Sequence, residues 1–361
     1  MSGITQTEIA DQLGISRSTV AKALHPRLQT QLSVQRRQSI LQTAERLGYR
    51  PHRQAQLMRG VKSHVIGIIK TTGMVQTGVE RSFYASQAIQ VAGYGLLVNE
   101  LHWDQTGERR AVDAMLDAHV EGVLLAGLAN MDDAVMAELQ RLRDAKIPVV
   151  AVGGVRLPAI PVVTTDYRQG MAELTKHVLS LGYRNLALVS MIRPDDANLS
   201  WQWGFAERLA GFGEATAAAG LNAAQARVLH QPLTTGWTDS YAPGQAAIQQ
   251  LVASGDRPAV LLCSNDDMAI GAIAACVEAG WRVPADIAIT GFDNSTVGRY
   301  VVPPLTTMAQ PTEAVAKQAV ELLLKQMRGE TISASTALVK LPCQLVVRQS
   351  CGAKQKERTQ P

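Results

Sequence analysis

The chain has 361 residues, an aromatic content of only 4% and a net charge of +4. No apolar run reaches the roughly 18 residues of a membrane span, and the start, Met1–Ile4, lacks the character of a secretion signal. The four cysteines show neither a C-x-x-C pair nor a histidine at metal-ligand spacing, and they suit a reducing cytoplasm. We therefore expect a cytoplasmic protein without a membrane span, metal site or cofactor.

The positive charge is concentrated near the N-terminus. Residues 1–62 contain ten Lys or Arg against three acidic residues, a net charge of +7 that leaves −3 for the rest of the chain. A basic head on a mildly acidic body is typical of a phosphate-binding module attached to a domain of another kind.

Two short helices around a glycine are predicted close to the start of the chain. Thr5 and Glu8 have capping-box spacing, and Gly14 permits a left-handed turn after the first helix. Ser16 is a candidate cap for the second helix, which has Val20 on its buried face. Together these features form the helix-turn-helix signature, whose second helix enters the major groove of DNA.

The outward face of that second helix carries Arg17, Ser18 and Lys22. Arginine and lysine donate to guanine edges, and serine contacts a base or a phosphate. The alternative is that the three are ordinary solvated surface residues, but the helix-turn-helix pattern favours the DNA-reading role.

A third helix is predicted after Ser33, its candidate N-cap, and it ends near Gly48. Pro51 blocks continuation of this helix. The basic, weakly apolar segment from His52 to Gly60 is interpreted as a linker.

From residue 65 short apolar runs alternate with amphipathic stretches of helix length, which predicts parallel sheets covered by helices. About 300 residues exceed a single core, so two lobes are expected. The predicted strands are Val65–Ile69, Gly95–Asn99, Gly122–Ala126, Val149–Val152, Leu186–Ser190, Val260–Ser264 and Ile287–Thr290. The predicted helices include Val79–Ala92, Gln105–Ala118, Asp132–Ala145, Gln169–Leu181, Glu207–Ala219, Pro243–Ala253 and Met268–Ala279.

Polar side chains in loops after predicted strands are candidates for a ligand site, because parallel sheets bind ligands beyond the carboxyl ends of their strands. The candidates are Asp166, Arg208, Asn265, Asp266 and Asp293. Acids and amides accept from hydroxyls and arginine clamps oxygens, so the set suits a polyol, sugar or sugar acid. Each candidate has a structural alternative as a cap, turn former or inter-strand bond, and that alternative is strongest for Asp266, which precedes a helix.

The order and spacing of several motifs resemble the LacI/GalR (lactose-repressor-type) family of transcription regulators. The resemblance runs to about residue 348 and rests on segments 9–16, Ser18-Thr19-Val20, Leu47-Gly48-Tyr49-Arg50-Pro51, 264–271, Gly291-Phe292-Asp293-Asn294 and Pro303-Pro304-Leu305-Thr306-Thr307. Arg208 with Gly211-Phe212 also matches the family's Arg-x-x-Gly-Phe, and Asn265-Asp266 matches its Asn-Asp pair.

The resemblance implies a helix-turn-helix head and a two-lobed sensor of the type I periplasmic-binding-protein kind, whose lobes are joined by three crossovers around a small ligand. We expect a head at 1–50, a hinge at 51–62 and an effector-binding and dimerisation domain at 63–348. Lobe 1 would hold about 63–163 and 294–326, and lobe 2 about 164–293 and 327–348. Residues 349–361 would form a disordered tail.

The family's hinge wedges an apolar side chain into the minor groove. Met58 falls at the wedge position, and Leu57 is the competing candidate. The whole set of expected DNA-binding residues is Thr5, Ser16, Arg17, Ser18, Thr19, Lys22, Tyr49, His52, Ala55, Leu57 and Met58.

Departures from the family concern the ligand site. The loop after the first strand, Gly73–Val79, lacks the aromatic residues that members often carry there, and Tyr167 replaces a common Asn. Trp201 and Trp203 fall in a long predicted loop, 191–206, and either stack on a sugar or pack as a lid or interface. Trp237, in another loop near Tyr241, is included among the expected effector contacts.

Three functions are compatible with a two-lobed ligand-binding body: a ligand-controlled transcription factor, a soluble sugar-binding protein and a sugar-acting enzyme with a DNA-binding head. The basic head argues against the second. The third would need a nucleophile or base constellation, and none is visible in the sequence. We therefore expect a regulator, most simply a repressor, that binds a near-palindromic DNA operator as a homodimer.

Overall fold

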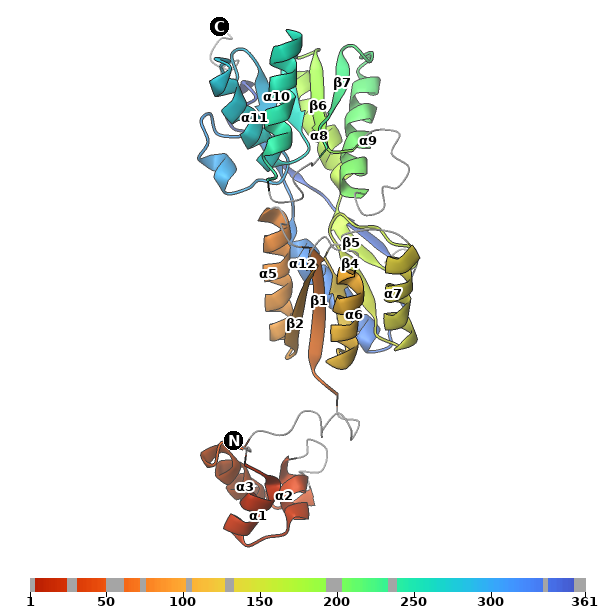
Figure 1. Ribbon diagram of the computed structural model, residues 1–361, viewed down its shortest axis with the longest axis vertical. Coiled ribbons are helices and arrows are strands. Elements are labelled where there is room, and N and C mark those ends of the chain that lie inside the picture. Colours follow the sequence, from red (N-terminus) through yellow and green to blue (C-terminus); the bar gives the residue numbers. More distant parts are fainter. Residues whose placement is uncertain are drawn as a thin grey trace. The chain divides into compact units, whose positions relative to one another are not determined.

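The computed structural model describes residues 4–24, 31–49, 62–71, 76–101, 106–126, 133–192, 203–232, 239–333 and 337–353. The chain divides into two compact units, Met1–Ser63 and His64–Pro361 (Figure 1).

Three helices form the described part of the first unit: α1 (Gln6–Leu13), α2 (Arg17–Leu24) and α3 (Val34–Arg46). The sequence explains where α1 begins and ends, since Thr5 and Glu8 make the predicted capping box and Gly14 is left-handed with a φ of 62°. Ser33 caps α3 by accepting from the backbone N–H of Arg36. Each helix contributes one fully enclosed side chain to the core, namely Ile9, Val20 and Ile40.

The first lobe of the second unit is a six-stranded parallel sheet in the order β11-β5-β4-β3-β1-β2, with helices on both faces (Figure 1). Its strands are β1 (Val65–Thr71), β2 (Gly95–Leu101), β3 (Gly122–Leu125), β4 (Val149–Val152), β5 (Val162–Thr165) and β11 (Leu338–Leu341). Its helices are α5 (Gln76–Val91), α6 (Gly107–Asp117), α7 (Asp133–Asp144) and α12 (Thr312–Met327). Side chains of β1 alternate between two cores: Val65 and Ile69 pack with α6 and α7, whereas Ile66 and Ile68 pack with α5 and α12.

The second lobe is a four-stranded parallel sheet in the order β7-β6-β8-β9. Its strands are β6 (Leu186–Ser190), β7 (Ala226–His230), β8 (Val260–Cys263) and β9 (Ala288–Thr290). Its helices are α8 (Tyr167–Ser180), α9 (Trp203–Ala218), α10 (Ala242–Ser254) and α11 (Asp266–Glu278). Leu186 and Leu188 face α8 and α9, and Ala187 and Val189 face α10 and α11. All of the predicted strands and helices are thus present.

Three chain segments connect the lobes. One joins β5 to α8, a second runs from β9 through β10 (Thr307–Ala309) to α12, and a third joins β11 to β12 (Gln344–Val346). β10 and β12 pair antiparallel, and the N–H of Asp166 donates to the carbonyl of Leu341 at 2.7 Å. The crossovers are therefore hydrogen-bonded to one another where they pass between the lobes.

Two expectations about the C-terminal part are wrong. Residues 338–341 were expected in the second lobe, but they form β11, which pairs with β5 at the edge of the first sheet. The expected disorder from residue 349 fails for its first residues, since Ser350 and Cys351 are fully buried and the Ser350 hydroxyl donates to the carbonyl of Ile289 at 2.6 Å. Residues 354–361 lie outside the described residues.

Candidate nucleic-acid interface and effector site

Helix α2 exposes the three side chains that the sequence places on its reading face. Arg17, Ser18 and Lys22 are exposed, whereas Val20 and Ala23 are buried against the rest of the head. A solvent-facing cationic stripe on the second helix of a helix-turn-helix is the arrangement that a major groove accepts.

Four other predicted DNA-binding residues have structural partners within the head. The Thr5 hydroxyl accepts from the N–H of Glu8, and the Ser16 hydroxyl accepts from the N–H of Thr19 at 3.2 Å. The Thr19 hydroxyl lies 2.9 Å from that of Ser16, and half-buried Tyr49 packs on the head's core. Their DNA contacts stay predictions. His52, Ala55, Leu57 and Met58 lie outside the described residues.

Arg208 is held deep in the second lobe. It was expected to open a helix, but α9 begins at Trp203, whose side chain is buried, so Arg208 lies one turn inside the helix. Its guanidinium carbon is 4.2 Å from the ring centroid of Tyr167 and 4.4 Å from that of Phe292, and Nη1 donates to the carbonyl of Gly204 at 3.1 Å. The two rings fix the plane of the guanidinium by cation–π contact.

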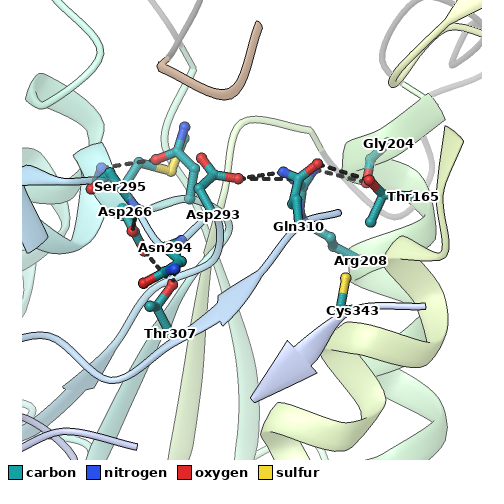
Figure 2. A network of polar contacts seen from close by, with 12 residues as sticks. Thr165, Gly204, Arg208, Asp266, Asp293, Asn294, Ser295, Thr307, Gln310 and Cys343 are labelled. Atoms are coloured by element: carbon teal, nitrogen blue, oxygen red, sulfur yellow. Dashed lines mark hydrogen bonds and ion pairs between the residues drawn. The ribbon is translucent and has the colours of Figure 1, made fainter. Parts of the chain in front are cut away.

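Asp293 follows β9 and meets Arg208 through a small polar network (Figure 2). Oδ1 of Asp293 lies 3.7 Å from Nη2 of Arg208 and accepts from Nε2 of Gln310 at 2.5 Å. Oε1 of Gln310 accepts from the Thr165 hydroxyl at 2.9 Å and from Nη1 of Arg81 at 3.3 Å. These five residues, which we name the interlobe polar cluster, come from both lobes and from the crossover that leads to α12.

The charges and hydrogen bonds of this cluster are not fully satisfied by the described protein. Burial raises the pKa of the Asp293 carboxyl, and the Arg208 guanidinium opposes that shift. Nε of Arg208 is buried and has no hydrogen-bond partner among the described residues. Leaving a buried donor unsatisfied costs about 1–3 kcal/mol, so an oxygen supplied from outside the described protein would be bound favourably there.

Asp266 has a structural role. Its side chain is fully buried, Oδ1 accepts from the Thr307 hydroxyl at 2.6 Å, and Oδ2 accepts from the N–H of Ser295 at 2.6 Å (Figure 2). Burial raises the pKa of Asp266 to about 6. The carboxylate thus braces the chain after β9, which is the structural alternative weighed for it.

Asn265 and Asp166 act as helix caps. Asn265 accepts from the N–H of Met268 at 2.9 Å at the start of α11, and Asp166 accepts from the N–H of Gln169 at 3.2 Å at the start of α8. Both lie at carboxyl ends of strands, as the sequence predicted, but these bonds already use one side-chain oxygen of each residue.

The aromatic candidates are spread around the second lobe. Trp203 was placed in a loop and instead opens α9, and Tyr241 directly precedes α10 with 41% of its surface exposed. Tyr167, flagged as a departure from the family, forms one wall around the Arg208 guanidinium. Trp201 and Trp237 lie outside the described residues.

Sequence reasoning missed Arg81, Thr165 and Gln310. Only Thr165 carried a usable signal, as the last residue of an apolar run before a proposed ligand residue. Gln310 comes from the crossover after β10 and Arg81 from the middle of a helix, and neither position follows a predicted strand.

Metal binding and membrane insertion are two other properties that the described residues bear on. Among them, no group of three or more His, Cys, Asp or Glu side chains is placed to hold a metal ion. In the same part of the chain, no helix is both long and apolar enough to cross a membrane.

Comparison with known proteins agrees with this architecture. Residues 175–351 match the model of a periplasmic binding protein-like domain. The chain is 27% identical to catabolite control protein A of Priestia megaterium, covering 96% of this chain and 99% of that one. It is 28% identical to the HTH-type transcriptional regulator CelR of Thermobifida fusca, covering 95% and 96%.

A solved structure shares the fold. The lac repressor dimer bound to operator and the anti-inducer ONPF superimposes with a TM-score of 0.78 at 23% identity, covering 97% of this chain and 99% of that chain. A head of three helices and a two-lobed sensor define the class of ligand-binding transcriptional regulators. The relatives and the solved structure that this chain resembles are regulators of the lactose-repressor kind, in agreement with the resemblance that its motifs carry.

Proposed function

We propose that this chain is a repressor whose DNA affinity is set by a small hydroxylated effector bound at the interlobe polar cluster. The observation that carries the proposal is the buried, ring-stacked Arg208 beside Asp293, with an unsatisfied Nε, at the hinge of a sensor that follows a helix-turn-helix head. The domain scheme stays as expected, except that β11 joins lobe 1 and residues 349–353 are folded with the sensor.

In this proposal α2 reads an operator, and its exposed residues Arg17, Ser18 and Lys22 approach base edges. The remaining DNA contacts are assigned to backbone positioning or to the hinge wedge, Met58 or Leu57. Helix-turn-helix heads of this size act in pairs on two half-sites, so we assign two heads to one near-palindromic site.

The effector acts by differential binding. Arg208 and Asp293 belong to the second lobe, whereas Thr165 ends β5 of the first lobe and Gln310 lies on a crossover, so a ligand that contacts the cluster binds one lobe arrangement better than another. Asp166, Asn265 and Trp237 are assigned supporting contacts, whereas Asp266 is assigned the bracing role that its two hydrogen bonds give it. A structure of the regulator CelR, with a TM-score of 0.66, is a complex with cellobiose, and this supports a sugar-like effector.

The sensor surface supports a dimer. Val79 and Phe83 on α5 are each 56% exposed, and Val302, beyond η3 (Val297–Arg299), is 82% exposed. Figure 1 shows α5 and the short helix η3 on the same side of the second unit. Apolar side chains that water would otherwise surround are suited to a two-fold interface, and the lac repressor structure is a dimer.

An exported sugar-binding protein and an enzyme are the weaker candidates. The first does not need a basic helix-turn-helix head, and the relatives named above are regulators. We propose a cytoplasmic regulator without catalytic activity or cofactor.

The test combines ligand and DNA binding with the full chain. A thermal-shift panel of sugars, sugar acids and phosphorylated sugars should reveal a ligand that, at about 100 times its Kd, stabilises the folded sensor by roughly 2.7 kcal/mol. The same ligand should change affinity for an operator selected from random duplexes. Selection of no DNA sequence, or a bound ligand without effect on DNA affinity, contradicts the proposal.

A further inference from the structure

Arg81 places a guanidinium at the carboxyl edge of the first sheet. Gly153 directly follows β4, with a φ of +94°, and a Cβ there would lie 3.1 Å from Nε and Nη2 of Arg81. Nη1 of Arg81 donates to Oε1 of Gln310 at 3.3 Å. The side chain is therefore held between the end of β4 and the crossover that leads to α12, on the first-lobe side of the interlobe polar cluster.

The positive charge of Arg81 has no neutralising partner within the described residues. A guanidinium has five N–H donors, and the bond to Gln310 uses one of them. The neighbouring Glu80 carboxylate is occupied elsewhere, since it accepts from Nε2 of Gln76 at 2.8 Å and from the Thr312 hydroxyl at 3.3 Å. No carboxylate of the described chain lies within 4.0 Å of Arg81, whereas Arg208 has Asp293 at 3.7 Å.

The acidic candidates for the effector site are already engaged by donors of the protein. Asp266 accepts two hydrogen bonds, Asp166 caps α8, and Asp293 forms a pair with Arg208 that is neutral as a whole when both are charged. The second-lobe pair thus combines a donor group with an acceptor group, which suits hydroxyls. Arg81 offers only donors and a full charge.

The sequence of segment 73–79 does not offer a sugar ring an aromatic side chain to stack on. Its seven residues are Gly, Met, Val, Gln, Thr, Gly and Val. The fork of an arginine matches the two oxygens of a carboxylate, and a charge-assisted pair of this kind is stronger than a bond to a neutral hydroxyl.

We infer that the effector is an anion, a sugar acid with its hydroxyls on Arg208 and Asp293, and that Arg81 is the specificity-determining residue that binds its carboxylate. This inference rests on the proposed function, because it names the ligand class of the same site.

The experiment is calorimetric titration of the full chain with matched pairs of ligands: gluconate against sorbitol, glucuronate against glucose and galacturonate against galactose. Arg81→Gln keeps a hydrogen-bonding side chain but removes the charge. Arg109→Gln is the control, because Arg109 is exposed on α6. At least one acid should bind the wild type about tenfold or more tightly than its neutral counterpart.

In Arg81→Gln the affinity for that acid should fall about tenfold to a hundredfold, with the neutral counterpart changed by less than about threefold. Arg109→Gln should match the wild type. A neutral sugar that binds as tightly as its acid, or an Arg81→Gln variant that weakens both equally or neither, overturns the inference and leaves the proposed function standing. If no member of any pair binds, the inference fails, and if the wider thermal-shift panel also yields no ligand that alters operator affinity, the proposed function fails with it.

Discussion

Nη2 of Arg208 lies 3.7 Å from Oδ1 of Asp293, and both side chains are more than nine-tenths buried. A charge-assisted hydrogen bond is usually 2.7–2.9 Å long, so this pair is close enough for attraction but too far apart to satisfy both groups. The rings of Tyr167 and Phe292 hold the guanidinium in place, and its Nε has no acceptor among the described residues. This geometry supports the proposal that the pair binds a third partner.

Arg208→Ala and Asp293→Ala should each weaken effector binding. Either change removes a charged group from the pair and leaves a ligand hydroxyl without its partner, a loss of about 1.5–3 kcal/mol, or tenfold or more in Kd. Calorimetric titration with the ligand found in the thermal-shift panel measures this, and unliganded operator affinity should stay close to that of the wild type unless the effector is a corepressor.

The matched control for these two variants is Arg282→Ala. Arg282 is an exposed arginine of the same lobe whose partner is Asp286, so its removal should leave effector affinity unchanged. Wild-type affinity in both Arg208→Ala and Asp293→Ala would place the effector elsewhere in the molecule.

Arg17→Ala should reduce discrimination between DNA sequences. An exposed arginine at the start of α2 that reads a guanine contributes about 1–3 kcal/mol on the specific site and little on random duplex. Competition binding with both DNAs measures the difference. Arg46→Ala, in the last turn of α3, should not change the ratio; an equal loss on both DNAs for Arg17→Ala would assign Arg17 to phosphate contact.

Met58→Gly should reduce both specific affinity and the bend of the bound DNA. A wedge side chain compensates for unstacking a base step, and glycine has no side chain to insert. Fluorescence resonance energy transfer across the operator reports the bend angle. An unchanged bend in Met58→Gly together with a lost bend in Leu57→Gly would transfer the wedge role to Leu57.

Local sequence signals predicted the helix-turn-helix and most of the strands well. Gly14 and the Thr5–Glu8 capping box act within one turn of the chain, and the burial of β1 on both faces follows directly from its run of apolar residues. Arg208 and Asp293 were found because each lies in a motif with a recognisable spacing, and their side chains do meet.

The rest depended on contacts that no local pattern encodes. β11 is half-buried along its length, so its sequence does not distinguish a strand of one lobe from a strand of the other. Gln310 joins the cluster only because the crossover carries it beside Thr165, a residue 145 positions away. Because segment 191–206 was predicted as a loop, the prediction missed the start of α9 at Trp203.

A charge placed in the exposed apolar surface of the sensor should break the dimer. Phe83→Glu is the first variant, because Phe83 is 56% exposed on α5 and burying a glutamate against a partner would cost several kcal/mol. Sedimentation at micromolar concentration should show a dimer for the wild type and a monomer for the variant, with weaker operator binding. The exposed Val252→Glu, on α10, serves as the comparison for a charge placed outside the proposed interface. A wild-type monomer that binds DNA tightly would contradict the dimer.

The last prediction concerns the glycine that follows Arg208 in its motif. Gly211 lets α9 approach α8, since a Cβ at Gly211 would lie 2.2 Å from the carbonyl oxygen of Arg168 and 3.1 Å from the N of Ala172. Because these are backbone atoms, Gly211→Ala forces the two helices apart and should lower the free energy of unfolding by about 1–3 kcal/mol. Gly213 lies on the same helix with nothing within 4 Å of its Cβ position, so Gly213→Ala should raise stability by about 0.5–1 kcal/mol through helix propensity alone. Urea unfolding followed by tryptophan fluorescence measures both, and effects of the same sign would show that close packing of α8 and α9 does not require the glycine.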